Sequence, residues 1–196
     1  MEKEEKIIKL NSTWMFWYAS RKKEDHSIPY DKRLQPVIEI DSLNEFIRSY
    51  YYIKPVELME RDKEIGFFKK GYQPLWESCP KAGYWFVRFK RTDSLSMINL
   101  KWERLLFALI CERFDEPHIL GAVLSIRGRE TIIELWFNYF KSEKIKNNLA
   151  HKIRQFLQID SDYNIFFKDI ESSIKDKSTS RYAEVYAFKK RKNTFC

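Results

Sequence analysis

Short runs rich in aromatic and β-branched residues recur along the chain between polar segments, a pattern that predicts β-strands. Gly83 precedes one run and Gly128 lies between two others, as tight turns require. The predicted strands are Trp14–Tyr18, Leu34–Ile40, Ile65–Lys69, Tyr84–Lys90, Leu120–Arg127, Thr131–Phe137, Asn164–Lys168 and Tyr182–Phe188.

Three other segments carry apolar residues at helical spacing. Asp41 or Ser42 can cap the first, whose apolar side is Leu43, Phe46, Ile47 and Tyr50. Asn99 can cap the second, whose stripe is Trp102, Leu105, Leu106, Leu109 and Ile110. Ser142 opens the third, with Ile145, Leu149, Ile153, Phe156 and Leu157. Together these segments predict an α+β fold: an antiparallel sheet with helices on one face and the other face open as a binding surface.

The 196 residues contain no internal repeat or low-complexity linker, and the length suits one domain. We expect a domain over residues 11–188, preceded by a flexible arm of residues 1–10 with an apolar end. Residues 189–196, which begin Lys-Lys-Arg-Lys, are expected to form a basic tail. Such a run is usually solvated, and a weak contact to an RNA backbone is the alternative.

The composition is globular, with 44% hydrophobic and 33% charged residues, but aromatic residues reach 16%. Most of these rings belong to the core, although flat aromatic faces also stack on bases. A net charge of +8 favours polyanionic partners such as nucleic acid, phosphates or an anionic membrane surface.

Three scattered cysteines, Cys79, Cys111 and Cys196, indicate reduced thiols in the cytosol or nucleus. No apolar stretch approaches the roughly 20 residues that span a bilayer, and the N-terminus lacks an apolar secretory segment. We therefore expect a soluble, monomeric cytoplasmic protein, also possible in the nucleus, with no membrane partner.

Motifs for catalysis or metal binding are not found. His26, His118 and His151 have no cysteine or carboxylate at metal-ligand spacing. The chain has five glycines, no phosphate-binding glycine loop, no Gly-x-Ser-x-Gly elbow and no obvious cysteine–histidine pair. We expect no catalytic residue, no metal and no cofactor.

The informative stretch is Gly71-Tyr-Gln-Pro-Leu-Trp-Glu-Ser. Pro74 favours an extended loop, in which Trp76 offers a stacking face beside the acceptor-only carboxylate of Glu77. A carboxylate accepts from both donors of the guanine Watson–Crick edge, N1–H and the exocyclic amine, in charge-assisted hydrogen bonds. The alternative is a core tryptophan next to a solvating glutamate.

At these residues the chain resembles the eukaryotic translation initiation factor 4E family of cap-binding proteins, over roughly residues 10–180. The ordered matches are Trp14-Met-Phe-Trp17-Tyr, Asp41-Ser-Leu-Asn-Glu-Phe46, Phe68-Lys-Lys-Gly71-Tyr-Gln-Pro74-Leu-Trp76-Glu77, Gly83-Tyr-Trp85, Trp102-Glu-Arg-Leu-Leu, Gly121-Ala-Val-Leu-Ser-Ile-Arg127 and Trp136. The resemblance implies a curved eight-stranded antiparallel sheet with three long helices on the convex face and a cap site on the concave face.

The resemblance also implies roles for individual residues. Trp76 and Tyr30 would sandwich the 7-methylguanine, Glu77 would bind its edge, and Trp136 would lie beside the methyl group. Tyr30 stands where the family usually has Trp, a feature of its divergent "homologous protein" branch. Methylation makes the base cationic, and a cation between two aromatic faces gains about 2 kcal/mol over neutral guanine.

For the triphosphate, Arg127 matches the family's phosphate-binding arginine. The usual second position, a lysine, is Ile132 here. Arg129, Lys175 or Lys177 could replace that lysine, and simple surface charge is the alternative for each.

On the convex face the family binds initiation-scaffold or repressor peptides. The corresponding residues are Leu43, Ile47, Glu103, Arg104 and Phe107. Ile47 replaces a tryptophan and Arg104 reverses a charge, so we expect a helical partner peptide with altered selectivity.

Three functions follow as hypotheses. The first is binding of capped mRNA, with recruitment for translation initiation. The second is a repressor that occupies caps without recruiting the scaffold. The third, based on charge and aromatic content alone, is general RNA binding or nucleotide hydrolysis.

Overall fold

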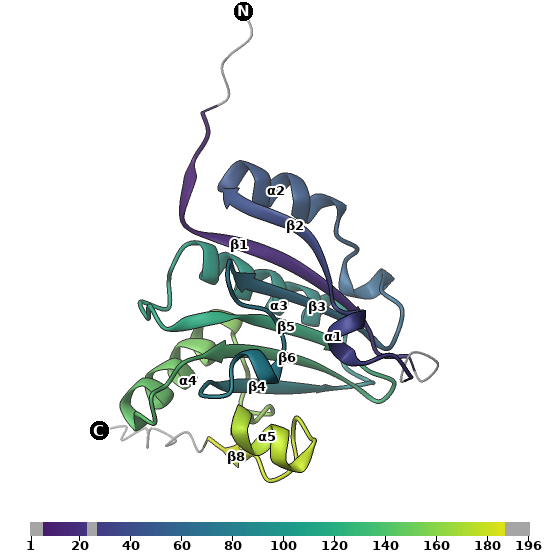
Figure 1. The fold of residues 1–196 in the computed structure, drawn as a ribbon, viewed down its shortest axis with the longest axis vertical. Helices are drawn as coiled ribbons and strands as arrows, with labels where there is room; N and C mark the ends of the chain where they lie inside the picture. The colour runs from purple at the N-terminus through teal and green to yellow at the C-terminus, as the bar shows by residue number, and fades with distance from the viewer. Residues whose placement is uncertain (1–5, 23–26, 187–196) are drawn as a thin grey trace, which may run out of the picture.

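The computed structural model describes residues 6–22 and 27–186. Its centre is one curved antiparallel sheet of eight strands in the order β2-β1-β3-β5-β6-β4-β7-β8 (Figure 1). The strands are β1 (Lys9–Ser20), β2 (Gln35–Ser42), β3 (Lys63–Lys69), β4 (Gly83–Lys90), β5 (Ile119–Ile126), β6 (Glu130–Phe137), β7 (Ile165–Asp169) and β8 (Glu184–Val185). Each predicted strand is confirmed, although β8 is only two residues long and residues 187–188 lie outside the described part of the chain.

The three predicted long helices are α2 (Leu43–Tyr52), α3 (Leu95–Ile110) and α4 (Glu143–Leu157). Ser42 and Ser142 cap α2 and α4, as predicted. The predicted cap of α3 was wrong, because this helix begins four residues before Asn99, at Leu95, and Ser94 accepts the capping hydrogen bond. Asn99 lies inside α3, where its side-chain Oδ1 accepts from the Val56 backbone N–H at 3.0 Å.

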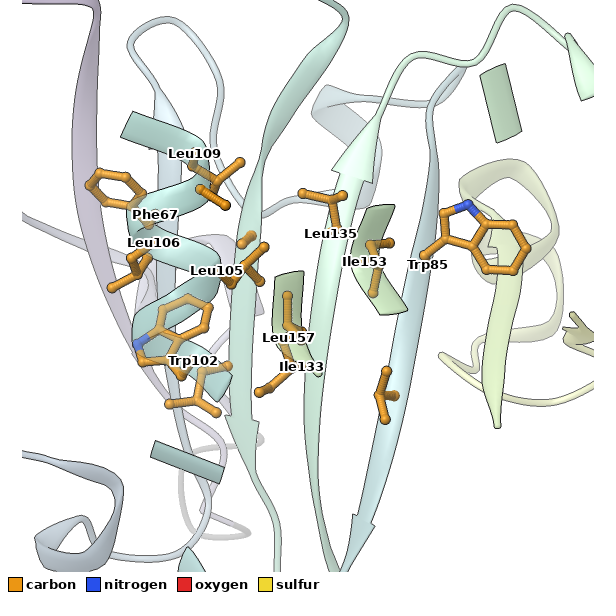
Figure 2. Close-up of a cluster of buried hydrophobic side chains, with 14 of the residues drawn as sticks. Phe67, Trp85, Trp102, Leu105, Leu106, Leu109, Ile133, Leu135, Ile153 and Leu157 are labelled. Atoms are coloured by element: carbon orange, nitrogen blue, oxygen red, sulfur yellow. The ribbon is translucent and has the colours of Figure 1, made fainter. Parts of the chain in front are cut away.

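The hydrophobic core lies between the sheet and these helices. Trp102, Leu105, Leu106 and Leu109 of α3 face the strands (Figure 2). Ile153 and Leu157 of α4 pack beside them against Ile133 and Leu135 of β6 (Figure 2). On β1, Trp14 stacks on Phe67 of β3, with ring centroids 4.8 Å apart. Apart from Ile47 of α2, which is 55% exposed, the apolar stripes that predicted the helices therefore form one continuous core.

The opposite, concave face is less open than the sequence suggested. It carries a second cluster of buried side chains, centred on Phe68, Tyr84, Phe86, Ile132 and Trp136. Short elements that the hydrophobic pattern did not predict adjoin this side: α1 (Tyr30–Arg33), the 3-10 turn η3 (Trp76–Ser78) and α5 (Ile170–Asp176). A further 3-10 turn, η2 (Val56–Leu58), precedes β3. The four elements have three to seven residues each, too short for helical periodicity to be recognised.

The chain ends differ in part from expectation. β1 begins at Lys9, and the Ile8 carbonyl accepts from the Leu43 N–H at 2.8 Å. Residues 8–10 are therefore part of the fold and not of a flexible arm. The predicted tail at 189–196 lies outside the described residues, as does His26. In the part of the chain that the structure describes, no helix is long and apolar enough to cross a bilayer.

Candidate functional site

A cavity of about 470 Å³ opens on the concave face. Its wall combines aromatic rings with three basic and three acidic side chains. The lining residues are Arg21, Tyr30, Arg33, Glu64, Pro74, Trp76, Glu77, Val123, Glu134, Trp136, Lys177 and Thr179. The four predicted base-binding residues, Tyr30, Trp76, Glu77 and Trp136, are thus brought together from three separate segments of the chain, α1, η3 and β6.

A glycine in β3 positions the loop that carries Trp76. A Cβ on Gly66 would lie 3.0 Å from Cγ of Pro74 and 3.3 Å from Cβ of Trp17. The absence of a side chain therefore lets the buried Pro74 pack directly on the sheet. The chain then turns through η3, so that half-buried Trp76 and exposed Glu77 stand at the mouth of the cavity.

Tyr30 is held by an ionic cluster at the cavity wall. Its hydroxyl donates to Glu64 Oε2 at 2.8 Å, while Arg21 Nη1 lies 2.9 Å from Glu64 Oε1. The Arg33 guanidinium lies 5.5 Å from the centre of the Tyr30 ring, within cation–π range. Burial favours the neutral form of Glu64, but Arg21, Arg127 and Tyr30 outweigh it and lower its pKa. Burial and the charge of Glu64 raise the pKa of Tyr30, so this phenol remains a donor.

Packing against two other aromatic rings fixes the position of the Trp136 side chain. Its ring is 5.7 Å from that of Tyr84 in a stacked pair and 5.4 Å from that of Phe68, edge to face. A Cβ at Gly121 would come within 2.5 Å of Phe68 Cγ, so only glycine lets Phe68 occupy this place. Trp136 is 2% exposed, so this tightly packed ring contributes only a small surface to the cavity that it lines. That placement suits contact with a ligand substituent better than full stacking.

Glu134 lies in the floor of the cavity, on the same face of β6 as Trp136. Its Oε2 accepts from Trp136 Nε1 at 2.8 Å. The residue is 4% exposed, and burial raises its pKa to about 7, although Arg127 and the Trp136 hydrogen bond act in the opposite direction. Glu134 pairs with Val123 of β5, which in turn pairs with Gly66 of β3, so the three residues form one row across the sheet.

The predicted phosphate-binding residues differ in whether they line the cavity. Lys177, in a left-handed conformation at the end of α5, lines the cavity. Arg127 does not line the cavity itself, but its Nη2 donates at 3.2 Å to Oγ1 of Thr179, which does, and its Nε donates to Ser125 Oγ at 3.1 Å. Arg129 and Lys175 do not line the cavity, and Lys175 borders a different hollow beyond α5. The geometry therefore favours Lys177 over these two as the substitute for the missing lysine.

The convex face carries the residues predicted to bind a partner peptide. Ile47 is 55% exposed on α2, Leu43 is half-buried, and Phe107 of α3 packs edge to face on Phe46. Arg104 Nη1 donates to Gln158 Oε1 at 2.6 Å. A groove of about 450 Å³ between α3 and α4 is lined by Leu100, Glu103, Arg104, Phe107, Ala108, Cys111, Arg113 and Phe156.

Four charged cavity residues were not predicted: Arg21, Arg33, Glu64 and Glu134. The two acids had a detectable signal, because each is a carboxylate inside an apolar strand, Glu64 before Ile-Gly-Phe-Phe and Glu134 between Ile-Ile and Leu-Trp. Unpaired burial of such a group is costly, so it indicates a partner or a ligand. The two arginines carry no comparable signal. Among the described residues, no group of three or more histidine, cysteine or carboxylate side chains could hold a metal.

Comparisons with known proteins agree with this architecture. The family model described as eukaryotic initiation factor 4E matches residues 9–185. The chain belongs to this family. It is 33% identical over 160 residues to eukaryotic translation initiation factor 4E-4 of Caenorhabditis elegans, covering 78% of this chain and 72% of that protein. It is 28% identical over 176 residues to initiation factor NCBP of Arabidopsis thaliana, covering 88% of this chain and 77% of that protein.

A solved structure is similar in fold. It is the complex of Caenorhabditis elegans eIF4E-3 with the 4E-binding protein Mextli and a cap analogue. The TM-score is 0.79 at 21% identity, and the match covers 91% of this chain and 99% of that one. The family consists of translation initiation factors and not of enzymes, in agreement with the expectation of a non-catalytic protein.

Proposed function

We propose that the chain binds the 7-methylguanosine cap of mRNA in the concave cavity and recruits the mRNA for translation initiation. The observation that supports this best is the meeting of Tyr30, Trp76, Glu77 and Trp136 on one cavity wall. The cap analogue bound to the eIF4E-3 of similar fold gives the ligand class.

The chemistry of the wall matches the chemistry of the ligand. Trp76 and Tyr30 offer aromatic faces to the cationic base, worth about 0.5–2 kcal/mol for each desolvated cation–π contact. Glu77 is exposed at the mouth, where its carboxylate accepts from the two donors of the guanine edge. Lys177, Arg33 and the neighbouring Arg127 supply positive charge for the phosphates. The Arg33 Nε, which is shielded from solvent, has no hydrogen-bond partner among the described residues.

The test is titration with 7-methyl-GTP and with GTP, followed by tryptophan fluorescence. Stacking on Trp76 quenches its emission, and the methylated nucleotide is expected to bind much more tightly. Trp76→Ala is expected to abolish most binding, whereas Tyr72→Ala, a matched change in the same loop outside the cavity lining, leaves it unchanged. Wild-type affinity in Trp76→Ala would falsify the site.

A repressor that occupies caps without recruiting the scaffold is the second candidate. Two observations favour it: Ile47 stands exposed where a tryptophan is usual, and the Arg104 side chain is engaged by Gln158. Cap-affinity pull-down of the full chain separates the two functions. Recovery of the initiation scaffold supports recruitment. Its absence, with the cap still bound, supports repression, and equal affinity for GTP and 7-methyl-GTP contradicts both.

A further inference from the structure

Glu134 is a buried carboxylate with few compensating contacts. It is 4% exposed, and the one hydrogen bond that it makes with a described residue comes from Trp136 Nε1. Across the described residues, 6–22 and 27–186, no basic nitrogen lies within ion-pair distance of it. A carboxylate removed from water without a cationic partner is costly, so this position is unfavourable for the empty protein.

The neighbouring acid shows what full compensation looks like. Glu64 lines the same cavity and is 6% exposed, but Arg21 and Tyr30 each contact one of its oxygens. Its pKa is lowered despite burial, whereas burial raises that of Glu134. Glu64 and Glu134 line the same cavity, but the protein supplies close partners for the charge of Glu64 and not for the charge of Glu134.

The fold does not require an ionisable group at this place. The Trp136 indole needs one acceptor, and a neutral amide oxygen supplies it equally well. The charged groups that act on Glu134 are Arg127, Glu64 and Arg21, and both arginines are bonded elsewhere. The negative charge is therefore left for whatever occupies the cavity.

We propose that Glu134 is a specificity-determining residue, whose carboxylate supplies the counter-charge for a cationic planar ring in the cavity. The inference rests on the proposed function, in which that ring is N7-methylated guanine. Neutral guanine has no net positive charge for this carboxylate to attract, so Glu134 widens the difference in affinity between the two ligands. When the cation covers the carboxylate, the ionised form is favoured and a proton bound to Glu134 is released.

The test is the ratio of the Kd values for GTP and 7-methyl-GTP in wild type and in Glu134→Gln. Both ligands carry the same phosphates, so the ratio isolates the charge on the base. We expect the ratio to fall about tenfold in Glu134→Gln, mainly through weaker binding of 7-methyl-GTP. Glu39→Gln is the control, because Glu39 is exposed on β2 and pairs with Lys70 outside the cavity. It should keep the wild-type ratio.

A second measurement needs no variant. Carboxyl ¹³C NMR of the wild-type protein follows the Glu134 titration with each nucleotide bound, and we expect a lower pKa with 7-methyl-GTP than with GTP. An unchanged ratio in Glu134→Gln, or equal titration with both ligands, overturns the role of Glu134. If wild type itself does not prefer 7-methyl-GTP and Trp76→Ala has no effect, the proposed function fails instead.

Discussion

Replacing Glu134 by glutamine is expected to stabilise the empty protein at neutral and alkaline pH. In the folded state burial raises the pKa of this carboxyl to about 7, from an ordinary value of 4.5. A gap of roughly 2.5 between the two values corresponds to about 3 kcal/mol. Above pH 7 the folded protein bears this full cost, because its buried carboxylate is charged.

The direction with pH follows from proton binding. Between about pH 4.5 and 7 the unfolded chain has lost the Glu134 proton while the folded protein still holds it. The folded state then binds more protons, so the free energy of unfolding decreases as pH rises through this window. Glutamine keeps an acceptor for Trp136 and does not ionise. The free energy of unfolding of Glu134→Gln therefore lacks this decrease with rising pH.

The assay is urea unfolding followed by far-ultraviolet circular dichroism at pH 4.5 and pH 8. The other titrating groups are common to both proteins, so the difference between variant and wild type is the quantity to compare. That difference should grow by about 3 kcal/mol between the two pH values. Glu39→Gln should show no such growth. A pH-independent difference between Glu134→Gln and wild type would refute the reasoning.

Three further changes test the scaffold around the cavity. Tyr30→Phe removes the donor to Glu64 and should lower the free energy of unfolding by about 1.5–3 kcal/mol in urea titrations. An unchanged free energy of unfolding would show that this hydrogen bond does not stabilise the fold. Gly121→Ala drives a methyl into Phe68, so thermal denaturation should show a loss of roughly 1–3 kcal/mol or more, and wild-type stability would contradict the packing. Asp169→Ala removes the N-cap of α5 and should cost about 1 kcal/mol in urea titrations. Bound 7-methyl-GTP should still quench the tryptophan fluorescence of this variant, and an unchanged urea midpoint would exclude the cap.

Strands and long helices were predictable because each depends on local pattern. The caps at Ser42 and Ser142 stand next to clear apolar stripes, and both were placed correctly. At Asn99 the same rule failed, because a capping residue type inside a helix found a distant partner, the Val56 backbone. Local sequence does not distinguish a cap from an internal residue with a tertiary hydrogen bond.

The site was predictable in its aromatic and edge-binding residues and in Lys177, all of which were proposed from the family resemblance. The ionic wall was not, because Arg21 and Tyr30 bind Glu64, which lies 43 and 34 residues further along the chain. The face expected to be open is instead partly covered by η3 and α5, whose lengths are below the reach of periodicity. The ionic wall and the coverage of this face depend on tertiary contacts, and not on the local secondary-structure propensity of the sequence.

The seating of Pro74 on Gly66 has a kinetic consequence. The loop bearing Trp76 acquires its order when the sheet folds, so little conformational entropy remains to be lost when a nucleotide arrives. Capture of the ligand should then proceed without a slow rearrangement step, at a rate governed by encounter and charge. A methyl at position 66 would loosen that anchoring and slow productive capture without touching the nucleotide.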